Sequence, residues 1–325
     1  MSRRRRMVIA FGGNALVLKG QEGTQWEQIE NAQETARTLM PLLRDGHDLA
    51  LVHGNGPQVG NILIQVEEAV TKVPPQSLDV CVAQSEGSIG YMLELALLNA
   101  LRRERLRRQV VTMVTEVIVD QEDPGFRRPT KPIGPFYPRF RADYLMHKQG
   151  WNMIEDAGRG WRKVVPSPRP LEVVQMPALK EAVAAGHVVI AAGGGGIPVY
   201  RTQEGDLKGV EAVIDKDYTA ALVATGLGAD LLVGLTGVDQ VSLNYGQKDE
   251  RKLRRMTVDQ AREYLEAGQF PEGSMGPKVR AGIEFVEAQL GEVVITSPGK
   301  LAAAVRGRAG TRIVAAARPR LTKAR

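Results

Sequence analysis

The sequence predicts an α/β fold built on a largely parallel sheet, and two observations carry this prediction. Short apolar runs end at glycine-rich turns, and the segments after the first two turns have apolar residues at helical spacing. Strands and helices then alternate along the chain, an order typical of crossover units between parallel strands. With 325 residues, 43% of them hydrophobic, the chain is long enough for one large domain or for two lobes that share a sheet.

The first third of the chain contains two strands that lead into glycine turns. Strands are expected at residues 7–11 and 49–53, followed by Gly12-Gly13-Asn14 and Gly54-Asn55-Gly56, and a further strand is expected at 110–114. Backbone N–H groups converge at such turns, which suits them to hold an anion. Two amphipathic helices are expected to cover the sheet, with apolar positions at Trp26, Ile29, Ala32, Ala36, Leu39, Met40 and Leu43 and at Ile89, Met92, Leu93, Ala96, Leu97, Ala100 and Leu101.

A segment at about 123–170 interrupts the alternation of strands and helices. Prolines occur throughout it, and aromatic residues lie between them. A long ordered segment inside an α/β domain is usually functional, so we expect an inserted lid subdomain. Its small hydrophobic cluster would be formed by the aromatic residues Phe126, Phe136, Tyr137, Phe140, Tyr144, Trp151 and Trp161.

The remainder of the chain returns to alternating strands and helices. A third glycine turn, Gly193-Gly194-Gly195-Gly196, follows an expected strand at 187–192. No low-complexity linker or repeat separates the two halves, so one sheet can run through both. The other helices are expected at 177–185, 217–225, 258–267, 277–290 and 301–305, and the other strands at 231–235, 293–296 and 311–315.

The composition excludes several classes of protein. A single cysteine, Cys81, excludes internal disulfides and cysteine-cluster metal sites, and four histidines without an HExxH motif argue against a zinc enzyme. We therefore expect no metal ligands from the protein. The basic residues 3–6 precede an apolar run too short for a signal peptide or a membrane span, so a cytoplasmic protein without membrane association is expected.

The formal net charge of +6 comes from the two ends of the chain. Residues 1–6 and 317–325 are expected as basic tails, while the rest of the chain is slightly acidic. Nucleic-acid binding favours basic residues interleaved with aromatic ones, and this pattern is missing from the sequence. No nucleic-acid partner is expected.

Two lysines are candidates for chemistry because each is expected in the first turn of a helix. Asp215 can cap the helix of Lys216, and Lys278 follows Pro277, which fits the first position of a second helix with Ser274 or Gly276 as its cap. A lysine there faces the positive end of the helix dipole, which is unfavourable unless an anion is bound nearby. The alternative is that both are ordinary surface lysines.

Phosphoryl transfer requires alignment of donor and acceptor and neutralisation of charge on the transferring group. Lysines and backbone amides at glycine turns supply both. Asp217, adjacent to Lys216, is expected to hold both ammonium groups in place. The alternative for Asp217 is a plain carboxylate at the start of a helix.

The glycine motifs do not match the common nucleotide-binding fingerprints. Residues 54–60 read GxGxxxG, whereas the dinucleotide fingerprint is GxGxxG. The P-loop motif GxxxxGK[ST] is absent, and so is the set of Gly-rich loop, HRD and DFG motifs of protein kinases. A phosphotransferase with this sequence must therefore have another fold.

The chain resembles carbamate kinases, which form part of the amino acid kinase superfamily, from residue 7 to about residue 313. Several of the shared motifs are specific to carbamate kinases and not to the whole superfamily. The shared motifs as a whole are Gly12-Gly13-Asn14-Ala15-Leu16, His53 to Gly60, Gly87-Ser88-Ile89-Gly90-Tyr91, Thr130-Lys131-Pro132-Ile133-Gly134-Pro135, Gly193 to Val199, Gly209 to Asp217, Asn244-Tyr245-Gly246 and Gly273 to Val279.

The resemblance implies an open, mainly parallel sheet of about eight strands between helical layers. It implies an N-terminal lobe at 7–213 that binds carbamoyl phosphate and includes the lid at about 123–170. A C-terminal lobe at 214–316 would bind ADP or ATP, accompanied by Mg²⁺. The reaction implied is reversible transfer between carbamoyl phosphate and ADP, giving ATP and carbamate, which decomposes to ammonia and carbon dioxide. Homodimers are usual in this family.

Site residues carried over from the resemblance fall into three groups. Lys131 in the lid would contact carbamoyl phosphate, while Lys216 and Lys278 stabilise the transferring phosphoryl group and Asp217 orients them. The substrate would also be held by glycine and asparagine residues of the turns, namely Gly13, Asn14, Gly54, Asn55, Gly56, Gly194 and Gly195. Candidates for the nucleotide pocket are Asp215, Thr236, Tyr245, Met275 and Gly276.

Two positions depart from the family pattern. Glu86 stands where glutamine or a similar neutral residue is expected before Gly87, and residues 247–251 are more charged than usual. The first concerns the substrate side and the second the nucleotide rim. The alternatives are a kinase for acetylglutamate, glutamate, aspartate or uridylate, against which the lid motif at 131–135 argues, and a non-catalytic ligand-binding paralogue. A silent paralogue would be expected to lose Lys216, Asp217 or Lys278, and all three are present.

Overall fold

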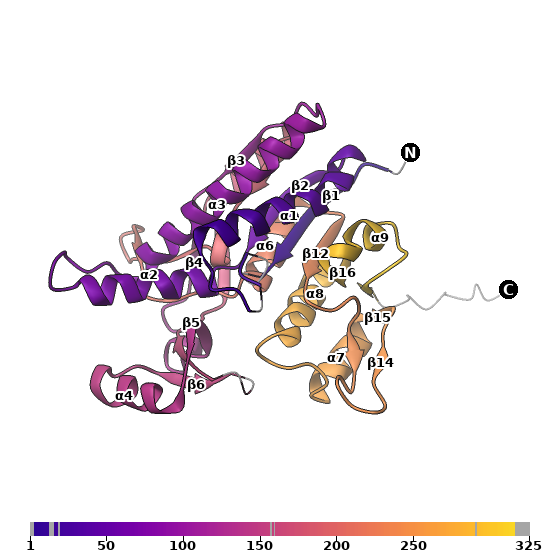
Figure 1. Cartoon of the computed structure of the whole chain (residues 1–325). Helices are drawn as coiled ribbons and strands as arrows, with labels where there is room; N and C mark the ends of the chain where they lie inside the picture. Colours follow the sequence, from indigo (N-terminus) through magenta and orange to yellow (C-terminus); the bar gives the residue numbers. More distant parts are fainter. Residues whose placement is uncertain are drawn as a thin grey trace.

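The computed structural model describes residues 3–12, 16–18, 20–156, 158, 160–289 and 291–315. Its centre is a single eight-stranded sheet in the order β15-β17-β16-β12-β1-β2-β9-β3 (Figure 1). These strands are β1 (Arg6–Phe11), β2 (Asp48–His53), β3 (Val110–Thr112), β9 (Val188–Ile190), β12 (Leu231–Leu235), β15 (Arg255–Thr257), β16 (Glu292–Thr296) and β17 (Thr311–Val314).

Six neighbouring strands of this sheet run in the same direction. The parallel pairs extend from β16 through β12, β1, β2 and β9 to β3, whereas β17 is antiparallel to β16 and carries β15 alongside it. The carboxyl ends of the six strands therefore meet at one edge, where ligands bind in open α/β sheets. Because β12 pairs with β1, the sheet runs through both halves of the chain and confirms the predicted mainly parallel sheet of about eight strands.

Helices cover both faces of the sheet, so residues 7–11 of β1 are all buried and successive side chains enter two different core clusters. Met7, Ile9 and Phe11 belong to one core cluster, which includes side chains of α1 (Gln25–Arg44) and α3 (Leu78–Arg103). Val8 and Ala10 belong to the other, with side chains of α6 (Lys216–Leu227) and α8 (Met275–Gln289). Three further helices complete the layers: α5 (Met176–Ala184), α7 (Val258–Glu266) and α9 (Leu301–Val305).

A second, four-stranded sheet lies beside the main one and was not predicted. It has the order β11-β10-β4-β8, and the short pair β13 (Ser242–Leu243) with β14 (Arg251–Lys252) is separate from it. Short strands without a clear alternation of apolar and polar residues give little signal in a sequence. The four strands are β4 (Glu116–Val119), β8 (Pro170–Val173), β10 (Ile197–Arg201) and β11 (Leu207–Gly209).

The proline-rich segment forms a small subdomain of its own. Its antiparallel sheet has the order β5-β7-β6, and its own cluster contains Ala142, Leu145 and Met153 with four aromatic or methionine side chains packed against them. In Figure 1 it projects from the lower part of the molecule on the side away from α7 and β14. Its elements are η2 (Pro124–Phe126), β5 (Lys131–Tyr137), α4 (Arg139–Gln149), β6 (Met153–Glu155) and β7 (Trp161–Val165).

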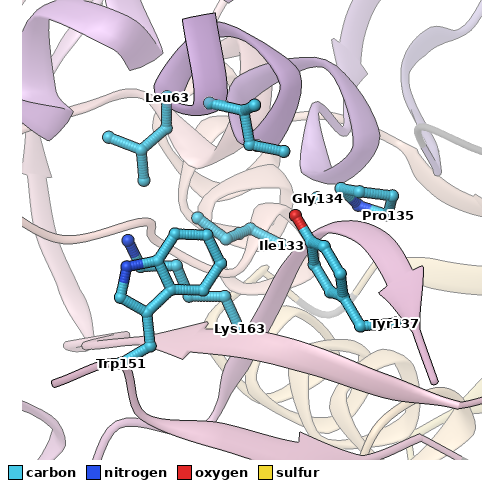
Figure 2. Close-up of a pocket in the computed structure, with 9 residues that line it drawn as sticks. Leu63, Ile133, Gly134, Pro135, Tyr137, Trp151 and Lys163 are labelled. Carbon is cyan, nitrogen blue, oxygen red and sulfur yellow. The ribbon is translucent and has the colours of Figure 1, made fainter. Parts of the chain in front are cut away.

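The subdomain packs against α2 (Gly56–Ala69) through a small, largely apolar contact (Figure 2). Leu63 of α2 faces Ile133, Tyr137 and Trp151 of the subdomain across it. Lys163 lies 4.0 Å from the Trp151 ring centre, and its Nζ donates to Glu67 Oε1 of α2 at 2.8 Å. This contact fixes the subdomain against the helix that follows the second glycine turn.

Three local predictions are wrong. Of the seven aromatic residues expected in the cluster of the inserted subdomain, Tyr137, Trp151 and Trp161 pack against it, whereas Phe136, Phe140 and Tyr144 are exposed and Phe126 packs against the main core. Trp26 was expected on the buried face of α1, but it is 69% exposed as the second residue of that helix. Pro277 was expected at the first position of its helix, but α8 begins at Met275. Pro277 is tolerated as the third residue of α8 because N–H groups of the first turn lack helical acceptors.

Candidate active site

The turn after β9 is the geometric centre of the candidate site. Residues Gly193–Gly195 form a short 3₁₀ turn (η3) whose glycines are buried. Gly194 has φ +69°, and a Cβ there would lie 2.1 Å from Asn55 Nδ2; Gly195 has φ +102°, and a Cβ there would lie 2.4 Å from the Ile214 carbonyl oxygen. Only glycine combines this left-handed conformation with such close approach. The turn therefore contacts both the segment that follows β2 and the segment that precedes α6.

The turn after β2 places the start of α2 at the same edge of the sheet. Asn55 is the residue before the helix, yet its side chain makes no capping hydrogen bond; its Nδ2 instead donates to Ser85 Oγ at 2.8 Å. The Gly54 N–H donates to the Phe11 carbonyl at 2.8 Å, which fixes the turn to β1. Unpaired N–H groups at a helix start attract anions.

Asp217 joins two lysines from different helices. Lys216 and Asp217 are the first two residues of α6, and the Asp215 side chain caps this helix by accepting from the Asp217 N–H at 2.9 Å. Lys216 Nζ and Lys278 Nζ, the latter from the first turn of α8, each donate to Asp217 Oδ2 at 3.0 Å. The structure thus brings together the three residues that the sequence singled out as a phosphoryl-binding group.

Burial and mutual charge set the ionisation of this cluster. Burial by itself would raise the pKa of Asp217, but the ammonium groups of Lys216 and Lys278 hold that pKa below its usual value. For Lys216 the nearby carboxylates outweigh burial, and its pKa is raised. For Lys278 burial dominates, helped by repulsion from Lys216, and its pKa is lowered. One carboxylate facing two ammonium groups leaves positive charge that an anionic ligand can neutralise.

Lys131 connects the inserted subdomain to the same cluster. It is the first residue of β5, and its Nζ donates to Asp215 Oδ2 at 2.6 Å. Burial favours the neutral form of Asp215, but the charges of Lys131 and Lys216 depress its pKa strongly. All three predicted lysines therefore lie around two acidic residues at the start of α6, the cap Asp215 and the first-turn residue Asp217.

The remaining predicted residues are spread more widely. Gly13 and Asn14 lie outside the described residues. Thr236 directly follows β12, and its N–H donates to the Thr296 carbonyl at 2.9 Å. Met275 packs partly buried against the core at the start of α8, and Gly276 is buried next to it. Tyr245 is 63% exposed in the loop after β13. The roles of these residues in nucleotide binding stay predictions.

Two contacts at the site were not anticipated from the sequence. Thr219 Oγ1 of α6 donates to the Gly195 carbonyl at 2.8 Å, which ties the glycine turn to the helix of Lys216. Arg162 of β7 directs its guanidinium toward the start of α2, with Nη2 3.9 Å from the position of a Cβ on Gly56. Neither residue lies in a motif, and only the fold shows that they face the site.

The donor set does not provide a protein cage for a metal ion. Among the residues that the structure describes, there is no group of three histidine, cysteine, aspartate or glutamate side chains that could hold one. The two acidic residues at the start of α6, Asp215 and Asp217, are both engaged by lysines.

Comparison with protein families places the chain in one of them. The model of the amino acid kinase family matches residues 5–297. The chain therefore belongs to the amino acid kinase family. In the part of the chain that the structure describes, no helix is long and apolar enough to cross a membrane.

Within this family, the chain is similar to carbamate kinases. That of Thermococcus kodakarensis is 46% identical over 313 residues, covering 95% of this chain and 99% of that protein, and that of Pyrococcus furiosus is 44% identical over 312 residues with the same coverage. The structure of carbamate kinase from Giardia lamblia bound to AMP-PNP superposes with a TM-score of 0.88 at 41% identity, covering 97% of this chain and all of that one. The resemblance indicated by the motifs is confirmed.

Proposed function

We propose that this protein is a carbamate kinase that transfers a phosphoryl group reversibly between carbamoyl phosphate and ADP. In the direction of ATP synthesis, the bond between phosphorus and the carbamate oxygen breaks, and a bond between phosphorus and a terminal β-phosphate oxygen of ADP forms. The products are ATP and carbamate, which decomposes to ammonia and carbon dioxide. The transfer needs no protein nucleophile, because the ADP oxygen attacks directly.

The observation that carries this proposal is the pair of lysines fixed on one carboxylate oxygen of Asp217. In phosphoryl transfer the negative charge spreads over the oxygens of the transferring group, so preorganised positive charge stabilises the transition state. Lys216 and Lys278 come from the starts of two helices, and both ammonium groups are held 3.0 Å from Asp217 Oδ2. Asp217 thereby sets the spacing of the two charges before any ligand binds.

The two substrates are proposed to meet at the glycine turn. On one side, Gly54, Asn55 and Gly56 offer the uncapped start of α2 to carbamoyl phosphate, with Gly194 and Gly195 between this turn and the lysines. On the other side, the carboxyl end of β12 and the start of α8 would receive the nucleotide. Lys131 is proposed to exchange its ion pair with Asp215 for the substrate when the subdomain closes.

Further elements of the proposal are the metal, the assembly and the compartment. Mg²⁺ would arrive on the phosphates of ADP or ATP, where it screens their charge. A homodimer is supported by the outer strand β3 and by the neighbouring face of α3, on which Tyr91 is 62% and Leu95 40% exposed. Sedimentation of the purified protein tests the dimer. The cytoplasm, where ADP and ATP are available, is the expected compartment.

The proposal is tested by ATP formation from ADP, Mg²⁺ and carbamoyl phosphate in a coupled assay, corrected for spontaneous breakdown of carbamoyl phosphate. Wild-type protein should form ATP, and Lys216→Ala should lower turnover by at least about a hundredfold, since removal of one charge-stabilising donor commonly costs this much. Lys180→Ala, which removes an exposed lysine on α5, is the matched control. A folded wild-type protein that forms no ATP would redirect the assignment to another small acid substrate of the same family.

A further inference from the structure

Glu86 is a buried acid that the proposed mechanism does not use. It lies on α3, its side chain is almost completely buried, and the residue is 1% exposed. Its Oε2 accepts the Thr115 N–H at 3.0 Å, and Thr115 Oγ1 in turn accepts the Ala192 N–H at 3.0 Å. Two successive hydrogen bonds therefore connect Glu86, through Thr115, to the backbone of Ala192 just before the glycine turn.

The same side chain also contacts the turn directly. A Cβ on Gly193 would lie 2.6 Å from Glu86 Cγ and 2.4 Å from His53 Nε2, so the Gly193 backbone rests between these two side chains. The preceding residue, Ala192, has φ +50°, a left-handed conformation that residues with a Cβ rarely adopt. A conformation of this kind persists only when its surroundings hold it in place.

We propose that Glu86 is a positioning residue for the carbamoyl phosphate side of the site, acting as an uncharged acid that holds Ala192 and Gly193 in place and thereby fixes Gly194 against Asn55. The inference rests on the proposed function, because Asn55 precedes the helix start that would bind the substrate. Glu86 itself does not touch the substrate in this assignment. It acts through the glycine turn.

The charged and titratable groups that face Glu86 support an uncharged side chain. His53 of β2 is completely buried, which lowers its pKa to about 4, so it is neutral and offers no positive partner. Burial, reinforced by repulsion from Glu116 of β4 and opposed by the N–H groups of Thr115 and Gly193, raises the pKa of Glu86 to about 8. Each lysine of the cluster is already held by an aspartate.

The hydrogen bonding of the carboxyl group leads to the same conclusion. Among the residues that the structure describes, Glu86 Oε1 is buried and has no hydrogen-bond partner. An ionised carboxylate would leave that charged oxygen unsatisfied, which is costly, whereas a protonated carboxyl has the shape and zero charge of a glutamine. The resemblance leads us to expect glutamine or a similar neutral residue at this position. An uncharged Glu86 has the same charge as that residue, although its identity differs.

This role has a consequence for the pH dependence of activity. As the pH rises through the pKa of Glu86, a negative charge develops behind the turn that would hold an anionic substrate. Both the turn geometry and the local potential then become unfavourable for carbamoyl phosphate. We therefore expect kcat/KM for carbamoyl phosphate to fall on the alkaline side, with the KM for ADP unaffected, because the nucleotide binds on the other side of the lysines.

The test compares wild type with Glu86→Gln, Glu86→Ala and Glu94→Gln, using steady-state kinetics from neutral to alkaline pH. Glu94 is a matched control, since it lies two turns further along α3 and its Oε2 accepts the N–H of Thr112 in β3, away from the glycine turn. Glu86→Gln should match wild type within about twofold at neutral pH and lack the alkaline decline. Glu86→Ala should raise the KM for carbamoyl phosphate by about tenfold or more, and Glu94→Gln should keep the wild-type pH profile.

The outcomes separate the two levels of the argument. An active wild type whose alkaline decline persists in Glu86→Gln overturns the positioning role and leaves the proposed function intact. Equal loss of kcat/KM for both substrates in Glu86→Ala also overturns it, because that pattern indicates general damage to the fold. A folded wild-type protein that is inactive overturns the proposed function itself, and the positioning role with it.

Discussion

Two buried groups of titratable residues lie on opposite sides of the glycine turn, and burial affects them differently. On one side, Asp217 and its two lysines are charged, although the side chain of Asp217 is only 7% exposed. On the other side, Glu86 and His53 are each 1% exposed, and their pKa values of about 8 and about 4 leave both neutral at pH 7. Asp217, Glu86 and His53 are all buried, and what distinguishes them is the charge of the groups that contact them.

The difference shows what decides the ionisation of a buried group. Removal from water disfavours the charged form in every case, whereas opposite charges in contact and hydrogen bonds to the charged form oppose this effect. Asp217 has two such charges within 3.0 Å, whereas Glu86 has only N–H donors. The site therefore separates a charged half, suited to a transferring phosphoryl group, from an uncharged half that supports backbone geometry.

Asp217→Asn should produce the largest change, because it removes the charge that compensates both lysines. Breaking a buried ion pair from one side leaves uncompensated charge and costs roughly 3–5 kcal/mol of stability. Turnover should fall by at least about a hundredfold, since the lysines lose their common anchor. Thermal unfolding and the coupled assay measure the two effects. Near-normal turnover in a folded variant would contradict the role of Asp217.

Gly194→Ala should have the next largest effect, because it forces the two halves of the site apart. The new Cβ would lie 2.1 Å from Asn55 Nδ2 at a residue with φ +69°. Gly205→Ala is the matched control: its φ is +90°, but a Cβ there meets nothing within 4 Å. Both variants should lose about 1 kcal/mol from backbone strain, whereas only Gly194→Ala should also lose affinity for carbamoyl phosphate. Equal kinetics in the two variants would show that the contact with Asn55 is unimportant.

Glu86→Gln should change how the free energy of unfolding depends on pH, an effect that can be measured without substrate. The pKa of Glu86 rises from 4.5 in the unfolded chain to about 8 in the folded protein. Between these values the unfolded state releases a proton that the folded state retains, so wild-type stability falls as the pH rises through this range. Each pKa unit corresponds to about 1.4 kcal/mol. Denaturant unfolding at several pH values should show the variant losing less stability than wild type; parallel curves would indicate that Glu86 titrates normally.

His53→Asn should have a smaller effect on the pH dependence of stability. This effect appears on the acid side, whereas that of Glu86→Gln appears as the pH rises. Burial lowers the pKa of His53 from 6.5 to about 4, so below pH 6.5 the unfolded state binds a proton that the folded state does not. Wild-type stability is therefore lost as the pH falls through this range. The asparagine variant should lack this acid-side decline, although loss of the ring lowers its stability at every pH. The slope against pH, and not the absolute stability, is the relevant measurement.

Much of the charged half could be predicted from the sequence because its signals are local. The helix cap at Asp215, the lysine that follows it and the carboxylate of Asp217 are adjacent along the chain, and capping preferences operate over a few residues. The glycine turns were equally visible, because each directly follows an apolar run. The start of α8 was predicted within two residues, although Pro277 was placed wrongly.

The uncharged half could not be predicted, because its contacts join distant segments. Glu86 lies on α3, Thr115 in the loop between β3 and β4, and Gly193 in the turn after β9, and nothing in their local sequence indicates that they meet. The sequence marked Glu86 only as a departure from the family pattern. The small second sheet escaped prediction for a related reason, since its strands are short and the pairing of β4 with β8 and β10 spans many residues.

The sequence by itself determined the alternation of strands and helices, the glycine turns at the strand ends and the lysines with their acidic cap. These follow from periodicity, backbone preference and neighbouring charges, all of which act over short stretches of chain. The tertiary structure alone decided that Lys131 meets Asp215, that Lys278 meets Asp217 and that Glu86 lies behind Gly193 without a positive partner. Charge state in a buried site depends on which groups the fold brings into contact, and this information is not local.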